Sequence, residues 1–203
     1  MNEPLQPAKT AARMDWFLLV LLTISLSGNV LLGYGVFRLS TRVGPVGAAA
    51  ARQEAPIPEV GTALPALDVR NLQGEKVSLS FASDQRPTVI YVFTPECTWC
   101  ARNLNNLKAI VAASQQSYRI VGLSLDPNVS SYLKDTGLEF PVYTSPSREM
   151  VAAYGFGSTP STIVVSPEGK LMKFWRGAYA STNKKEVEDF FHVTLPGLKT
   201  ATE

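Results

Sequence analysis

The sequence of 203 residues contains only two cysteines and one histidine, which restricts the metal and cofactor sites that it can form. A tetrahedral zinc site requires about four ligands, and His192 is the one histidine available beside the cysteine pair. A haem-attachment motif requires a histidine directly after the second cysteine, whereas Ala101 stands there. The sequence also lacks a glycine-rich phosphate loop and a Ser/His/Asp set. We therefore expect no metal site within one chain and no organic cofactor.

Neither sign of charge is in clear excess, since 19 lysines and arginines face 17 aspartates and glutamates for a net charge of +2. A protein that binds DNA or RNA normally carries a basic patch or stripe, so this balance argues against nucleic acid as a partner. Charged residues make up 18% of the chain, below the roughly 25% typical of soluble domains. The shortfall predicts a concentrated apolar segment.

That segment lies near the amino terminus, where residues 16–37 contain no charged side chain. About 22 residues form a helix of roughly 33 Å, enough to cross a bilayer core of about 30 Å. A cleaved secretory signal is the main alternative, because the alanines at 48–50 offer a cleavage site, and a buried core helix is another. The run is longer than the about 7–15 residues of a signal core, and Arg38 and Arg42 separate it from the alanines. Basic residues flank the run on both sides, so charge alone does not set its orientation.

The chain is therefore expected to divide into five parts. A tail (1–15) precedes the transmembrane anchor (16–37), and a linker (38–60) rich in glycine, alanine and proline follows it. A globular domain (61–195) and a carboxyl-terminal tail (196–203) complete the chain.

The globular part alternates the patterns of strands and helices. Two short strands, 67–69 and 77–79, flank a turn signal and predict a hairpin, and the continuous apolar run 89–93 predicts a strand covered on both faces. The further elements are expected to be helix 98–113, strand 120–125, a short helix from 128, strand 140–143, helix 147–154, strand 161–165, strand 171–175 and helix 182–191. The strand, helix, strand succession predicts a parallel crossover, and the two strands between 161 and 175 predict an antiparallel hairpin. The expected class is α/β with a mixed sheet.

The helix expected at 98–113 carries an apolar stripe at spacings of four, three and four residues. Its members are Cys100, Leu104, Leu107 and Val111. Asn103 and Asn106 fall outside this spacing and are expected away from the buried face. Cys100 should therefore be buried where the helix begins.

The two cysteines form the only Cys-x-x-Cys motif, and Cys97 falls in the loop between a central strand and a helix. Free backbone N–H groups and the positive end of the helix dipole favour an anion at such a position. The pKa of the Cys97 thiol should therefore be lowered, which makes it the attacking sulfur, with Cys100 as the resolving partner. Glu96 acts in the opposite sense if its carboxylate lies beside Cys97, although it can equally be a solvated loop residue. A purely structural pair of buried thiols is the alternative to a redox couple.

Two segments stand out in the globular part: YVFTPECTWC, which a helix follows, and the later GSTPSTIVV. With VGLSLD, EFPV, SPEGKL and the amino-terminal anchor, they resemble the membrane-anchored TlpA/ResA-like thiol-disulfide oxidoreductases. The resemblance covers roughly residues 61–191. It implies a thioredoxin fold with a mixed central sheet and an amino-terminal hairpin, preceded by one transmembrane helix.

The resemblance also implies roles for individual residues. In that family the first cysteine attacks and the second resolves, which gives these roles to Cys97 and Cys100. A proline at the position of Pro160 is cis and packs beside the pair, and Thr159 would offer its backbone to the partner polypeptide. Trp99, together with Pro160, would supply hydrophobic surface for substrate binding.

The chain departs from the family pattern at two places. The dipeptide Thr98-Trp99 lacks the proline that many relatives carry between the cysteines. Tyr91 stands where cytosolic thioredoxins keep a buried acid, so no carboxylate is evident to take the proton of Cys100.

A second resemblance points to another enzyme class. The segment TPECT also resembles the peroxidatic segment of a peroxiredoxin, in which Thr94 would help to bind peroxide and Arg176 would activate the thiolate. However, Ile90 stands where those enzymes place a proline. In addition, Cys100 lies closer to Cys97 than the resolving cysteine of most peroxiredoxins does.

The expected function is a membrane-tethered thiol-disulfide oxidoreductase that reduces disulfides of partner proteins. Its soluble domain should lie outside the cytoplasm, in the periplasm if the cell is Gram-negative, and an upstream thiol-disulfide protein would supply its electrons. Candidate partners are an apocytochrome in cytochrome c maturation, an assembly factor and a misoxidised envelope protein. A peroxiredoxin-like peroxidase, or a binding module that captures partners around Trp99 and Pro160 without turnover, remains open.

Overall fold

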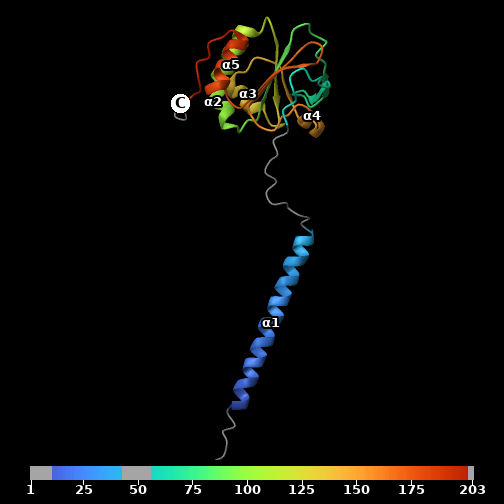
Figure 1. The fold of residues 1–203 in the computed structure, drawn as a ribbon, viewed down its shortest axis with the longest axis vertical. Coiled ribbons are helices and arrows are strands. Elements are labelled where there is room, and N and C mark those ends of the chain that lie inside the picture. Colours follow the sequence, from blue (N-terminus) through green and yellow to red (C-terminus); the bar gives the residue numbers. More distant parts are fainter. Residues whose placement is uncertain (1–10, 43–55, 201–203) are drawn as a thin grey trace, which may run out of the picture. The chain divides into compact units, whose positions relative to one another are not determined.

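The computed structural model describes residues 11–42 and 56–200, and the chain divides into two compact units, residues 1–51 and 52–203. The long amino-terminal helix and the globular unit are drawn in Figure 1, and each is described here by itself. The candidate cleavage site and most of the predicted linker fall outside the described residues, as do the outer ends of both predicted tails.

Helix α1 (Ala11–Arg42) contains the apolar run. Its stretch Leu18–Gly35 has a mean hydropathy of 1.7, and none of it is buried. Thr23, Ser27 and Asn29 each donate a hydrogen bond to a carbonyl about one turn earlier in the same helix. Such internal pairing satisfies polar side chains without water. By length and composition α1 can cross a membrane, and a signal sequence would meet the same criterion.

The globular unit is built on a seven-stranded mixed sheet in the order β2-β1-β5-β4-β3-β6-β7. Its strands are β1 (Leu67–Arg70), β2 (Lys76–Leu79), β3 (Thr88–Phe93), β4 (Arg119–Ser124), β5 (Val142–Thr144), β6 (Ser161–Val165) and β7 (Leu171–Arg176). Strand β3 pairs in parallel with β4 and antiparallel with β6, and the hairpins β1–β2 and β6–β7 are antiparallel. The expected α/β class, the parallel crossover and both hairpins are confirmed.

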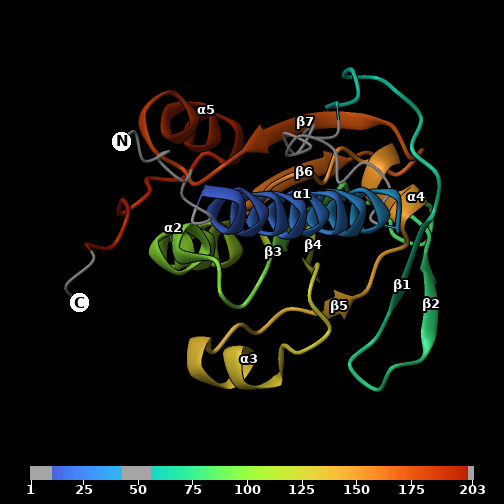
Figure 2. The ribbon, with the colours of Figure 1, turned by 90° about the horizontal axis from the view of Figure 1, so that it is seen from below.

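Helices cover the sheet unequally, as Figures 1 and 2 show. The helices of this unit are α2 (Thr98–Ser114), α3 (Ser130–Thr136), α4 (Arg148–Ala153) and α5 (Ser181–Phe191). Side chains of α2 and α5, and Tyr132 and Leu133 of α3, pack on one face of the sheet. The β1–β2 hairpin and the segment around α4 cover the other face.

Strand β3 is buried on both faces, which explains its continuous apolar sequence. All six of its residues are buried. Ile90 and Val92 belong to the cluster on the hairpin side, whereas Tyr91 and Phe93 belong to a cluster on the side of α2. Because alternate side chains of a strand point to opposite faces, a strand between two layers is apolar at nearly every position, and in β3 the exception is confined to Thr88 at its start.

The predicted buried face of α2 is wrong in part. Leu104 and Val111 are only half-buried, while Asn103 and Asn106 are completely buried. The buried residues of the helix are Cys100, Asn103, Asn106, Leu107, Ile110 and Ser114. A prediction from hydrophobic periodicity always assigns polar residues to the exposed face. These two asparagines are buried because they hydrogen-bond to each other and to backbone N–H groups of distant segments.

The packing of the sheet predicts a contrast between two leucines. Leu123 on β4 is 1% exposed and Leu72 in the β1–β2 turn is 51% exposed. Leu123→Ala should lower the free energy of unfolding by about 2–5 kcal/mol because it leaves a cavity in the core. Leu72→Ala should change it by less than about 0.5 kcal/mol. Urea-induced unfolding followed by circular dichroism measures both, and equal losses would contradict the assigned core.

Candidate functional site

The cysteine pair lies where the central strand β3 passes into helix α2. Cys97 is the N-cap residue of α2, with an extended backbone (φ −76°, ψ 104°). It forms a disulfide with Cys100. The backbone N–H of Cys100 donates to Cys97 Sγ at 3.0 Å, and the N–H of Ala101 donates to the Cys97 carbonyl at 3.1 Å. The first cysteine sulfur thus takes the place of the oxygen of an ordinary N-cap side chain.

The two sulfurs differ in their access to solvent. Cys97 is half-buried at the start of the helix, whereas Cys100 is completely buried. The helix has 17 residues, so its dipole favours negative charge at its first turn. Glu96 is exposed and directly precedes Cys97. The arrangement leaves the Cys97 sulfur partly accessible to solvent and encloses the Cys100 sulfur.

Trp99 lies between the cysteines and is 51% exposed. The guanidinium of Arg102 stands over its ring, 4.6 Å from the centroid. Arg102 is itself held by the end of the chain, because its Nε donates to the Lys199 carbonyl at 3.0 Å and the Lys199 N–H donates to the Arg102 carbonyl at 2.9 Å. Part of the segment predicted as a tail (196–203) therefore packs on α2 and supports the position of Trp99.

The predicted binding residues line one hollow of about 230 Å³. Its walls are formed by Trp99, Thr159, Pro160, Gly177, Ala178 and Ala180. The Thr159–Pro160 peptide bond is cis, as the family resemblance implies. Pro160 is buried and its carbonyl accepts from the Gly177 N–H at 2.8 Å. The structure thus brings Trp99, Thr159 and Pro160 together, although they are far apart in sequence.

Tyr91, Asn103 and Asn106 are buried polar side chains on β3 and α2, and the sequence predicted a buried strand at Tyr91 but not the burial of the two asparagines. Tyr91 on β3 is 1% exposed, and Asn103 and Asn106 on α2 are fully buried. Burial raises the pKa of the Tyr91 phenol well above its ordinary value, so this side chain is neutral at physiological pH. The sequence offered one indication that Asn103 is buried: it lies three residues after Cys100 and hence on the same side of the helix.

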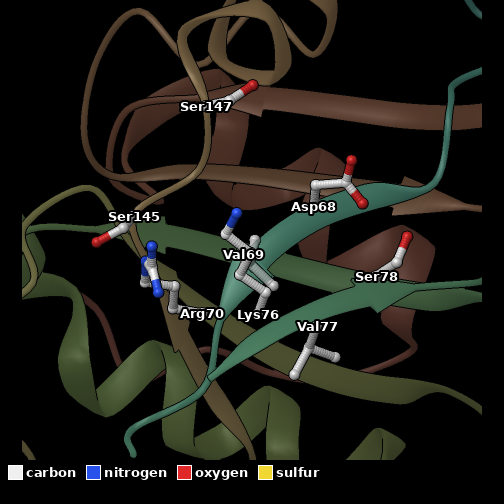
Figure 3. Close-up of a pocket in the computed structure, with 8 residues that line it drawn as sticks. All are labelled: Asp68, Val69, Arg70, Lys76, Val77, Ser78, Ser145 and Ser147. Atoms are coloured by element: carbon white, nitrogen blue, oxygen red, sulfur yellow. The ribbon is translucent and has the colours of Figure 1, made fainter. Parts of the chain in front are cut away.

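A larger hollow, about 530 Å³, lies between the β1–β2 hairpin and the loop that leads to α4 (Figure 3). Its lining residues are Asp68, Val69, Arg70, Lys76, Val77, Ser78, Ser145 and Ser147. None of the predicted site residues is among them. Arg70 is engaged locally, since its Nη1 donates to the Gly74 carbonyl at 2.6 Å. Among the described residues, no group of three or more His, Cys, Asp or Glu is placed to hold a metal ion.

Residues 60–174 match the AhpC/TSA family. The chain therefore belongs to the AhpC/TSA family. A thioredoxin-like protein from Haemophilus influenzae is 27% identical over 109 residues, which cover 52% of this chain and 63% of that protein. The thiol-disulfide oxidoreductase ResA from Bacillus subtilis is 29% identical over 69 residues, which cover 34% of this chain and 37% of that protein. The chain thus spans less than two thirds of the length of both relatives.

A solved structure supports the assignment of the fold. The thioredoxin domain of a thiol-disulfide oxidoreductase from Bacteroides vulgatus superposes with a TM-score of 0.53 at 20% identity, covering 66% of this chain and 99% of that one. The predicted thioredoxin fold is therefore confirmed. The sequence similarity to ResA confirms the predicted relationship to ResA-like thiol-disulfide oxidoreductases.

The unequal exposure of the two sulfurs predicts unequal reactivity once the disulfide is reduced. Iodoacetamide at neutral pH should modify Cys97 about tenfold faster than Cys100, because Cys97 is accessible and its thiolate lies at the helix N-terminus. Mass spectrometry of peptides from the full chain, sampled over time, gives both rates. Equal rates would contradict the assigned division between the two thiols.

Proposed function

We propose that this protein is a membrane-tethered thiol-disulfide oxidoreductase that reduces disulfides of partner proteins. The observation that carries the proposal is the cysteine pair itself: an accessible Cys97 at the start of a 17-residue helix, bonded to a buried Cys100. The apolar hollow that contains Trp99 and Pro160 lies on the same domain and supplies a surface for a polypeptide.

The exchange proceeds in two balanced steps from the reduced pair. The Cys97 thiolate attacks one sulfur of the partner disulfide, and the other partner sulfur leaves as a thiolate that takes up a proton. Cys100 then loses its proton and attacks Cys97 Sγ. This attack breaks the mixed disulfide, releases the second partner thiolate and leaves the Cys97–Cys100 disulfide. Two electrons have passed to the partner, so an upstream dithiol protein must restore them before the next turnover.

The proposed direction, from this protein to its partners, rests on the charges close to the pair. A strong oxidant of this kind needs a very stable thiolate. Residues 96–100 contain no cationic side chain, and Glu96 places a carboxylate next to Cys97. The nearby cation of Arg102 is directed at the Trp99 ring and the Lys199 carbonyl. A weakly stabilised thiolate favours the disulfide form and hence electron donation.

The proposed location is the outer side of the membrane, in the periplasm if the cell is Gram-negative, with α1 as the anchor. Support comes from the apolar helix and from the general rule that working disulfides belong to oxidising compartments. An apocytochrome, an assembly factor or a misoxidised envelope protein are the candidate partners.

A trapping experiment tests the assigned roles of the cysteines. Cys100→Ser in the full chain should accumulate mixed disulfides with partner proteins, because the thiol that releases them is gone. Cys97→Ser should trap none, and the double variant is the matched control. Trapping by Cys97→Ser alone would reverse the roles. In the wild-type chain, rapid consumption of hydrogen peroxide without turnover of a peptide disulfide would instead favour the peroxidase, and partner binding without either reaction would favour the binding module.

Protease accessibility tests the topology. In spheroplasts with an intact membrane, a protease that cannot cross the membrane should digest residues 61–203, and a cytoplasmic marker protein should survive. Protection of this domain until detergent is added would show that it lies on the cytoplasmic side.

A further inference from the structure

A network of buried hydrogen bonds fixes the side chain of Asn103 on α2. Its Oδ1 accepts two hydrogen bonds, one from Asn106 Nδ2 at 3.0 Å and one from the Tyr179 backbone N–H at 3.1 Å. Asn106 is fixed in turn, because its Oδ1 accepts from the Gly197 N–H at 2.8 Å. With its oxygen engaged twice, the Asn103 amide cannot rotate without losing both bonds, so the direction of its NH2 group is set.

That NH2 group and a neighbouring hydroxyl are the unusual feature of this region. Asn103 Nδ2 and Tyr91 Oη are buried side-chain atoms without a hydrogen-bond partner. The two lie beside each other, since the Asn103 side chain acts on Tyr91 as a hydrogen-bond donor and lowers its pKa against the larger rise caused by burial. The Tyr91 O–H itself has no acceptor among the described residues. Buried polar atoms are almost always paired, and an unpaired one is unfavourable. The Tyr91 hydroxyl and the Asn103 NH2 group are therefore adjacent donors that can take a further acceptor when one is formed next to them.

The atom that changes state in this region is the sulfur of Cys100. Cys100 and Asn103 are three residues apart on α2, and both are completely buried, so their side chains are neighbours on one helix face. Tyr91 belongs to the same buried cluster as Cys100, with Phe93 and Leu107. Both unpaired donors thus lie in the packed group that surrounds this sulfur.

Once the disulfide is reduced, hydrogen-bond donors near Cys100 can stabilise its thiolate. In the disulfide Cys100 is uncharged, but in the release step it must become a thiolate, and burial in apolar surroundings opposes that charge. The titratable groups in its cluster are Tyr91 from β3, Tyr132 from α3 and Cys97 from the loop before α2. Among the described residues, the buried polar side chains include no Asp, Glu, Lys, Arg or His. Neutral hydrogen-bond donors are therefore the groups that can stabilise the Cys100 thiolate.

We propose that Tyr91 Oη–H and Asn103 Nδ2–H donate hydrogen bonds to the Cys100 thiolate and so set its reactivity in the step that releases the partner. The proton of Cys100 goes to solvent, and Tyr91 keeps its own proton throughout. Hydrogen bonds to an ionised acceptor are the strong ones, so each donor lowers the pKa of the Cys100 thiol. The inference rests on the proposed exchange activity and assigns two further residues to it.

Hydroxyl deletion in the full chain tests the proposal. In a Cys97→Ser background, where Cys100 is the single thiol, Tyr91→Phe should raise the pKa of Cys100 by about one unit, measured as the pH dependence of its alkylation. Less thiolate is then present at neutral pH. With both cysteines present, Tyr91→Phe should slow release from a preformed mixed disulfide about tenfold and shift its pH profile upward, while formation of the mixed disulfide by Cys97 is unchanged.

Two further variants separate this role from packing. Tyr132→Phe removes a hydroxyl from the same cluster, where the Tyr132 ring stacks on Phe93, and should leave the pKa of Cys100 unaltered. Asn103→Leu removes the NH2 group without adding a charge, and should also raise the pKa of Cys100. It also tests the proposal if Tyr91→Phe does not fold.

An unchanged Cys100 pKa and release rate in Tyr91→Phe would overturn the inference, as would an equal shift in Tyr132→Phe. These outcomes are distinct from failure of the proposed function. If the wild-type chain did not exchange with a peptide disulfide, the function would fall, while the pKa of the single Cys100 thiol would still report whether Tyr91 and Asn103 act on it.

Discussion

The turn from β3 into α2 is the constraint on which the site depends. Strand β3 is buried on both faces and ends at Phe93, and α2 begins at Thr98. The strand's position in the sheet therefore fixes where the helix starts. Cys97 occupies the N-cap and Cys100 falls one turn inside. One sulfur is thereby placed near solvent and the helix N-terminus, and the other is placed in the core.

The rest of the domain supports this turn from two sides. On the outer side, the carboxyl-terminal segment binds Arg102 through Lys199, and Arg102 stacks on Trp99 beside the hollow. On the inner side, Asn103 is tied to the backbone at Tyr179. Residues after α5 thus pack on α2 at two places, where Lys199 binds Arg102 and where the Gly197 N–H donates to Asn106.

The sequence was most informative where structure is local. The apolar run of β3, the strand pattern at 161–165 and the Cys-x-x-Cys spacing depend on neighbouring residues, and the expected elements are present. The burial of Asn103 and Asn106 could not be predicted in this way, because the backbone groups that satisfy them lie 76 and 91 residues away. The hollow likewise requires loops from separate elements to meet. The cis bond before Pro160 was implied by family resemblance and not by the residues.

The reduction potential of the full chain tests the central claim most directly, because it compares the stability of the thiolate held at the turn with that of the disulfide. Equilibration with glutathione buffers, followed by quantification of the Cys97–Cys100 disulfide, gives the value. The account predicts a potential close to the about −270 mV of thioredoxin, because no cation between the cysteines stabilises the thiolate and the protein therefore donates electrons. A value near the about −120 mV of a strong oxidant would contradict it and make the protein a donor of disulfides.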